Sequence, residues 1–214
     1  MKKDQVYEKL RFEIVTNGIP PGEILNEKDL MGRLSIGRSP LREVLFRLQE
    51  ENLIKPLPRL GYMVTMLDIL DVNDLVELRR ELEGLAGSLA ARRITAEQLD
   101  ELRTMIQTAE VDAHKDQVFS SIAEYFDTRF HEHLYRATGN QKLVKILQDL
   151  HINMLRIWFH VGLGAIDFVQ EAHNLYLVLE SLEQGNPEKA RSAMEAHVDM
   201  FAAQIKDRFI SDRC

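Results

Sequence analysis

Residues 35–48 read SIGRSPLREVLFRL, and this stretch decides the fold of the N-terminal part of the chain. The apolar residues in the second half of this stretch recur at a spacing that places them on one buried face of a helix. We predict that Ser39 caps this helix and that Pro40 takes its first position, where a missing N–H costs nothing. Arg38 and Arg42 then lie at the positive end of the helix dipole, which is unfavourable unless an anion binds there.

The segments around this helix complete a recognisable unit. Apolar spacing predicts a first helix of about fifteen residues ending at Asn17-Gly18. Asn26 is expected to cap a second helix, which a short turn at 35–37 joins to the third. After Asn52 the pattern changes to two short strands around a loop, at 53–57 and 62–66. Three helices followed by a hairpin predict a winged helix-turn-helix.

In a helix-turn-helix the second helix enters the major groove of DNA by its N-terminal end. Arg38 and Arg42 can there reach phosphates or a guanine edge, and Ser39 a phosphate. Lys28 on the preceding helix is placed to touch the backbone, and Arg59 with Gly61 at the hairpin tip could reach the minor groove. The alternative is a solvated helix end whose arginines make ordinary surface pairs.

The composition is that of a water-soluble protein with two unlike parts. The chain has 214 residues, 45% hydrophobic and 29% charged, and its net charge is −7. Residues 1–66 carry 11 Lys+Arg and 9 Asp+Glu, whereas residues 67–214 carry 16 and 25. No apolar run approaches the ~20 residues of a membrane span, and the single cysteine, Cys214, allows no internal disulfide. We therefore expect a cytoplasmic protein.

The remainder of the chain is predicted to be an all-helical bundle. Thr95 and Gln98 form a capping-box pattern, and Asn140 is expected to cap a later helix. Gly185-Asn186-Pro187 reads as a helix stop followed by a proline in the first turn of the next helix. The expected helices cover about 74–93, 96–113, 117–138, 141–160, 167–184 and 187–209. The predicted domains are thus 1–66 and 67–214.

Three residues of this bundle suggest a metal site. Asp127 and His131 are four residues apart and share a helix face with apolar residues, and His197 also lies on an apolar face. A buried carboxylate and buried imidazoles need partners. A divalent metal would satisfy all three, and nitrogen and oxygen ligands suit zinc, nickel or manganese. The alternative is a buried, hydrogen-bonded trio without metal.

Residues 18–66 resemble the GntR family of bacterial transcription regulators, in the stretch GIPPGEILNEKDLMGRLSIGRSPLREVLFRLQEENLIKPLPRLGYMVT. Residues 72–93, VNDLVELRRELEGLAGSLAARR, and 124–140, EYFDTRFHEHLYRATGN, look like the FCD effector domain of the FadR-type subfamily. One departure is Gly37, where the family usually has Ser or Thr.

The resemblance implies a homodimeric regulator that binds a palindromic operator. Residues 1–66 would bind DNA, and residues 67–214 would bind an effector and form the dimer. The effector would be a small organic acid, whose binding releases or rearranges the protein on DNA. A repressor is the expected sense of regulation.

The resemblance also implies a metal site with one departure. Many relatives hold a metal with an Asp, a His four residues later, and one His on each of the last two helices. Asp127, His131 and His197 match three of these, but the fourth position falls at Leu175, which looks like core. His173 could substitute only if the helix is irregular there, since two residues turn an ideal helix by about 200°. Otherwise His173 is a partly exposed histidine near a pocket mouth.

Two arginines are candidates for binding the effector. Arg79 matches an arginine in the first helix of the family's effector domain, and it could hold a carboxylate with two hydrogen bonds. A pair with Glu83 or Glu77 is the alternative. Arg156, close in sequence to Trp158, is a second cation that could line the cavity.

Two other functions remain open at this point. A metal-dependent enzyme could use the Asp127, His131 and His197 site with an open coordination position. However, no nucleophile or general-base motif accompanies these residues, so we predict no catalytic residue. A protein-interaction module of helices would leave the arginines of residues 35–48 unexplained.

Overall fold

The computed structural model describes residues 2–67, 69–113, 119–162 and 165–211. Side chains are described outside residues 1, 68–71, 109–127, 163–173 and 209–214. The chain divides into two compact units, Met1–Asp68 and Ile69–Cys214, and each is described by itself. None of the helices searched among the described residues is long and apolar enough to cross a membrane.

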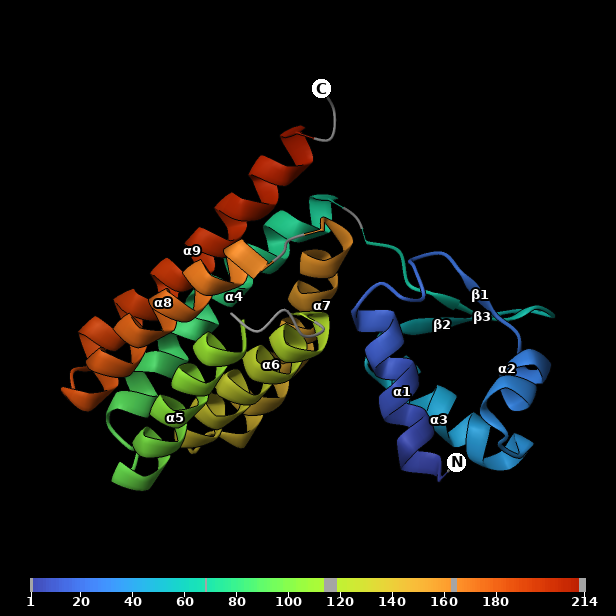
Figure 1. Cartoon of the computed structure of the whole chain (residues 1–214), viewed down its shortest axis with the longest axis horizontal. Coiled ribbons are helices and arrows are strands. Elements are labelled where there is room, and N and C mark those ends of the chain that lie inside the picture. Colours follow the sequence, from blue (N-terminus) through green and yellow to red (C-terminus); the bar gives the residue numbers. More distant parts are fainter. Residues whose placement is uncertain (1, 68, 114–118, 163–164, 212–214) are drawn as a thin grey trace. The chain divides into compact units, whose positions relative to one another are not determined.

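The first unit is a winged helix-turn-helix, as predicted. Its elements are α1 (Lys3–Val15), β1 (Ile24–Leu25), α2 (Glu27–Leu34), α3 (Arg38–Glu50), β2 (Ile54–Leu57) and β3 (Gly61–Val64). The strands form an antiparallel sheet in the order β1-β3-β2, and the three helices lie on one side of it (Figure 1). The sequence pattern predicted the hairpin but missed β1, because two residues are too few to show alternation.

Leucines from α1 and α3 form the centre of this unit. Leu10, Leu41, Leu45 and Leu48 are completely buried, so the apolar stripe of residues 35–48 faces the core as expected. Burying such side chains supplies most of the driving force for folding. The opposite face of α3 is left in solvent, and Arg42 lies on that face.

The start of α3 differs from the prediction. Gly37, in extended conformation, is the N-cap residue, and Arg38 is the first helical residue. The Gly37 carbonyl accepts a hydrogen bond from the Leu41 N–H at 3.1 Å. Ser39 is therefore not the cap, and Pro40 is the third helical residue. A proline fits there because the first-turn N–H groups have no partner inside the helix.

The second helix and the hairpin follow from local sequence. The Asn26 side chain accepts from the Lys28 N–H at 2.8 Å, so the predicted cap of α2 is confirmed. Gly61 has φ +117°, and a Cβ there would lie 2.4 Å from the Leu25 carbonyl oxygen. Only glycine allows this close approach of β3 to β1, so Gly61 has a structural reason to be present. Arg59, at φ 67°, forms the turn beside it.

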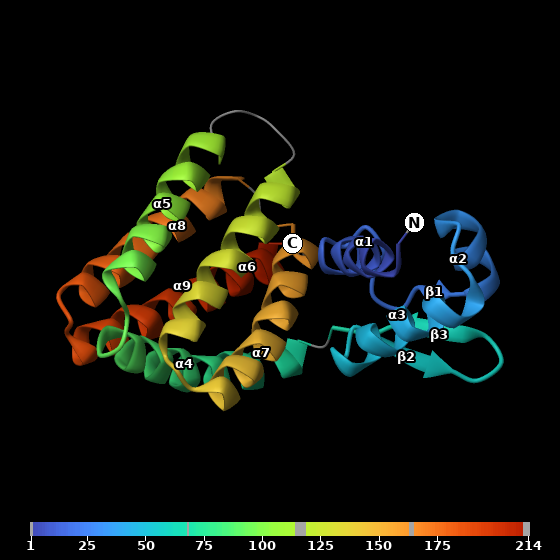
Figure 2. The same ribbon diagram turned by 90° about the horizontal axis from the view of Figure 1, so that it is seen from below.

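The second unit is all helical, as predicted. The described elements are α4 (Ile69–Ala91), α5 (Ala96–Ala113), α6 (Phe119–Ala137), α7 (Gln141–His160), α8 (Ala165–Glu183) and α9 (Pro187–Ser211). Thr95 and Gln98 exchange the two predicted capping-box hydrogen bonds, at 3.0 and 3.2 Å. The Asn140 side chain accepts from the Leu143 N–H at 3.3 Å and caps α7. In Figures 1 and 2, α9 runs beside both α4 and α8.

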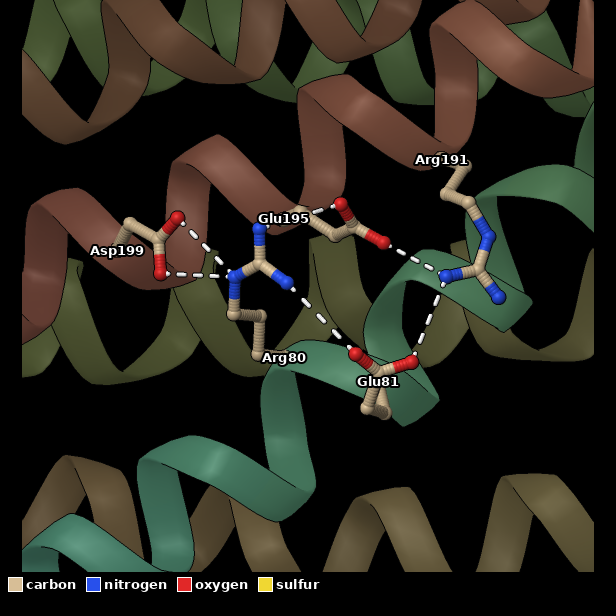
Figure 3. Close-up of polar contacts among 5 residues, drawn as sticks. All are labelled: Arg80, Glu81, Arg191, Glu195 and Asp199. Atoms are coloured by element: carbon tan, nitrogen blue, oxygen red, sulfur yellow. Dashed lines mark hydrogen bonds and ion pairs between the residues drawn. The ribbon is translucent and has the colours of Figure 1, made fainter.

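Helices α4 and α9 pack very closely. A Cβ on Gly87 would lie 2.5 Å from the Ala190 carbonyl oxygen, and one on Gly84 would lie 2.8 Å from a carboxylate oxygen of Glu195. A chain of charged side chains follows the same seam on its outer side (Figure 3). There Arg80 meets Asp199 at 3.1 Å, and Arg191 meets Glu195 at 2.7 Å. The two helices are thus fixed by backbone proximity inside and by alternating charges outside.

Candidate DNA-binding surface and effector pocket

The exposed side of α3 forms a shallow hollow. Arg38, Ser39, Arg42, Phe46 and Arg47 line it together with Glu43. Three of these side chains are cationic, and the hollow begins at the end of α3 where the backbone N–H groups have no partners inside the helix. The surface therefore suits the phosphate backbone and base edges of a DNA groove.

One carboxylate balances the arginines in the free protein. Glu27, the first residue of α2, lies 3.3 Å from Arg42 Nε and 4.0 Å from Arg38 Nε. The predicted need for an anion is thus met inside the chain in part, by Glu27. Both arginines remain largely exposed, so they are still accessible to a second anion.

The other predicted DNA contacts lie on separate elements. Lys28 is exposed in the first turn of α2, and Arg59 is exposed between β2 and β3. Phe46 is a surface residue that the sequence pattern did not single out, and 58% of it is exposed. The available signal was its position one turn after Arg42, on the face of α3 opposite the leucines.

In the second unit, histidines from three helices meet in one small pocket. His131 of α6, His151 of α7 and His197 of α9 line it, together with Arg79 of α4. His131 and His197 are 1% and 3% exposed, so the predicted burial of both is confirmed. Their Nε2 atoms lie 3.2 Å apart, which brings together two residues 66 positions apart in the sequence.

His151 was not predicted. Its ring centroid lies 4.5 Å from that of His131 in a tilted arrangement, and His151 is buried. The signal was present in the sequence, since His151 occupies the apolar face of α7 between Leu147 and Met154. A single histidine on an apolar face does not reveal, however, that histidines of two other helices meet it.

Arg79 belongs to a buried ionic cluster. Its guanidinium donates to Oε1 of Glu83 at 2.6 Å, and the Tyr135 hydroxyl donates to the same oxygen at 2.5 Å. Burial alone would raise the pKa of Glu83, but Arg79 and His131 nearby and the hydrogen bonds from Tyr135 and Arg79 hold it below its usual value of 4.5. Arg79 thus makes the pair with Glu83 that the sequence left open as an alternative, although the pair is buried rather than on the surface. Its role in binding an effector stays a prediction.

The other predicted residues of this site fall into three groups. Leu175 is completely buried in α8, as its core interpretation required. Arg156 is buried on α7, and burial lowers its pKa from 12.5 to about 10, yet it is not part of the described pocket wall. The side chains of Asp127 and His173 lie outside the described residues.

Within the described side chains, no group of three or more His, Cys, Asp or Glu is arranged to hold a metal ion. His131 and His197 meet through their Nε2 atoms, and the ring of His151 is tilted by 35° against that of His131. The predicted three-residue set cannot be assembled from this part of the chain alone, because Asp127 is not in it.

The remaining wall of the pocket is apolar and aromatic. Trp158 and Phe201 stack with ring centroids 5.2 Å apart and 29° between the planes. Met154, Leu155 and Val198 complete this side. The pocket thus has a cationic and imidazole side and an aromatic side.

Both units match known protein families over most of their length. Residues 2–64 match the bacterial regulatory proteins of the gntR family, and residues 74–200 match the FCD domain. The chain belongs to the GntR family of transcription regulators with an FCD domain. It is a DNA-binding regulator, and the enzyme alternative finds no support in this family or its relatives.

Similar proteins extend across nearly the whole chain. The HTH-type regulator YdhC of Bacillus subtilis is 27% identical over 94% of this chain and 90% of its own. The Nta operon regulator of Aminobacter aminovorans is 30% identical over 87% and 88%. The repressor RspR of Escherichia coli is 24% identical over 94% and 88%.

Two solved structures share the fold. The E. coli protein McbR/YncC is similar over 97% of this chain and 98% of its own, with a TM-score of 0.84 and 20% identity. An FCD domain in a metal-free form covers 68% of this chain and 99% of its own, with a TM-score of 0.56 and 18% identity. These similarities support the two-unit fold and leave the site residues to be argued from this chain.

Proposed function

We propose that residues 1–66 bind operator DNA through the N-terminal end of α3 and that residues 67–214 bind the controlling ligand. The observation that carries the first part is the exposed pair Arg38 and Arg42 at the start of that helix, beside the hollow that also contains Ser39. Lys28 and Arg59 would add contacts to the DNA backbone and to the minor groove.

We propose a homodimer on a palindromic site. Each chain presents one recognition helix, so an operator with two half-sites requires two chains related by two-fold symmetry. The second unit would supply the dimer contact. Sedimentation is expected to give about twice the chain mass of 24.7 kDa, and a monomer both with and without DNA would refute this assembly.

The proposed ligand is a small organic acid. Arg79 and three imidazoles form one side of the pocket, and these groups suit a carboxylate. The sense of regulation proposed is repression, as the name of the relative RspR states for that protein. A regulator of this kind works in the cytoplasm, where the operator lies.

A divalent metal fits this site in part. The Nε2 atoms of His131 and His197 lie 3.2 Å apart, within hydrogen-bond distance of each other, and imidazole nitrogens are ligands that divalent metals accept. His131 and His197 would therefore be two ligands of zinc, nickel or manganese. Asp127 would be the third ligand, and His173 stays a candidate for a fourth. Such a metal would offer an open position to the carboxylate of the ligand.

DNA binding by purified variants tests this function. The operator is first selected from random duplexes by the wild-type protein. Arg42→Ala is expected to weaken binding by about 1–3 kcal/mol and to relax base preference, whereas Lys28→Ala should weaken all duplexes alike and reduce the salt slope by about one unit. Arg136→Ala, an exposed arginine of α6, is the matched control and should leave binding unchanged.

If Arg38→Ala and Arg42→Ala both bind the selected duplex as tightly as wild type, the recognition surface is wrong. The ligand part is tested separately by calorimetric titration of chelator-treated protein with zinc, nickel and manganese. Equal metal affinity in wild type and His197→Ala would remove the metal site without affecting the DNA-binding proposal.

A further inference from the structure

The pocket between α4, α6, α7 and α9 has an aromatic side as well as cationic groups, and both bear on the ligand. This inference rests on the proposed function, in that the same pocket is taken to bind the ligand that controls DNA binding. What it adds is the chemical class of that ligand. The two sides of the pocket differ in chemistry, and each side favours a different part of a ligand.

The aromatic side includes a hydrogen-bond donor that no described group uses. Trp158 is 4% exposed, and its Nε1 atom is buried without a hydrogen-bond partner among the described side and main chains. An indole N–H buried in this way loses its hydrogen bond to water and needs a replacement. Since Trp158 lines the pocket, a ligand atom that accepts hydrogen bonds is the natural replacement.

The ring of Trp158 is held in place by a second aromatic ring of the pocket wall. Phe201 stacks on it at 5.2 Å, so the indole is part of a two-ring wall rather than a single mobile side chain. Flat aromatic groups bind such walls by offset stacking or edge-to-face contact. An acid without an apolar body would leave this wall, and the neighbouring Leu155 and Val198, facing water or empty space.

The opposite side selects an anion. Every polar residue of the described pocket wall (Arg79, His131, His151, His197 and Trp158) can donate a hydrogen bond, and none is a carboxylate. The positive charge of Arg79 is already balanced by Glu83. The preference for an anion therefore comes from the hydrogen-bond donors of the pocket wall acting together, and these suit one negative charge. One carboxylate is therefore favoured over a di- or tricarboxylate.

We propose that the pocket binds a small aromatic monocarboxylate. Its carboxylate faces His131, His197 and Arg79, and its ring packs against Trp158 and Phe201. A hydroxyl or similar acceptor on the ring takes the hydrogen bond of Trp158 Nε1. The cavity is small, about 10 Å³, so the ring enters only when side chains of the wall move, and Met154 is the most flexible of them.

Trp158 is the only tryptophan of the chain, so its fluorescence reports on this pocket alone. Wild-type protein is titrated with benzoate, 3-hydroxybenzoate, cyclohexanecarboxylate and malonate. Binding is followed by calorimetry and thermal shift for all four, and by Trp158 emission for benzoate. We expect saturable binding and a change of emission with benzoate, tighter binding of 3-hydroxybenzoate, and weaker binding of the non-planar and the dicarboxylic acids.

Trp158→Phe keeps an aromatic ring and removes the N–H. It should bind benzoate nearly as wild type does, and it should lose the advantage of 3-hydroxybenzoate, about 5- to 10-fold for one hydrogen bond. Phe159→Leu is the matched control, because Phe159 neighbours Trp158 on α7 outside the described pocket wall, and it should behave as wild type.

The outcomes separate this inference from the function it rests on. If malonate binds and releases operator DNA while both benzoates do neither, the ligand class is wrong and the ligand-controlled regulator stands. An unchanged preference for 3-hydroxybenzoate in Trp158→Phe would overturn the role of the indole N–H. If no acid binds although wild type still binds its operator, the ligand class and the ligand part of the proposed function both fall, and the DNA-binding part remains.

Discussion

Replacing Glu83 by Gln tests whether the buried cluster beside the pocket holds the second unit together. Glu83 is completely buried, and one of its oxygens accepts from Arg79 and Tyr135. The amide keeps the size of the side chain but removes its negative charge. Arg79, itself buried, then loses the negative charge of Glu83 in a region of low polarity.

The expected loss is large. Breaking a buried ion pair by removing one partner costs about 3–5 kcal/mol, because the remaining charge stays desolvated. For a domain of roughly 150 residues, 1 kcal/mol shifts the melting temperature by about 2–4 °C, so the expected drop is about 6–20 °C. Tyr135→Phe removes one hydrogen bond to the same carboxylate and should cost only about 1.5–3 kcal/mol.

The assay is thermal and urea unfolding of wild type, Glu83→Gln, Tyr135→Phe and the double variant Arg79→Met with Glu83→Leu. The double variant replaces both charges and should be more stable than Glu83→Gln alone. Glu81→Gln is the surface control, since this exposed residue of the outer charge network should change stability little. A Glu83→Gln protein as stable as wild type would refute the reasoning.

Three further expectations concern stability. Gly87→Ala places a Cβ against the Ala190 carbonyl and should cost about 1–3 kcal/mol in urea unfolding, whereas Gly32→Ala, with open space around it, should be neutral or stabilising. Asn140→Ala removes the cap of α7 and should cost about 1 kcal/mol, and a change within error would contradict the cap. The lowered pKa of Glu83 means that its contribution is complete above its unfolded pKa and is lost as pH falls through its folded pKa. Acid unfolding should therefore lose this pH dependence in Glu83→Gln.

Residues whose contacts lie within their own helix or its first turn were predictable from sequence. The caps by Asn26 and Asn140, the capping box at Thr95 and the buried stripe of α3 all depend on neighbours within four positions, which periodicity reveals. The start of α3 was placed two residues late, because Ser39 and Pro40 fit a cap by residue type while Gly37 takes the extended conformation.

Residues that act across helices were only partly predictable. Burial of His131 and His197 could be read from apolar faces, but the approach of His151 depends on how α6, α7 and α9 pack. Arg79 was assigned to a ligand or to a neighbouring acid, and only packing showed that Glu83 is buried with it. Phe46 was missed because only the charged residues of that face were considered, although its position one turn after Arg42 and opposite the leucines indicated an exposed side chain.

The position of Glu27 has a consequence for selectivity. A phosphate that approaches Arg42 or Arg38 must compete with a carboxylate already 3.3 or 4.0 Å away. Random DNA offers phosphates without the matching base edges, and these gain little by displacing Glu27. A correct operator offers phosphates and base edges together, and these additional contacts offset the loss of the ion pairs with Glu27. If Arg38 and Arg42 bind DNA as proposed, we expect this internal acid to lower the affinity for all DNA and to lower it least for the right sequence.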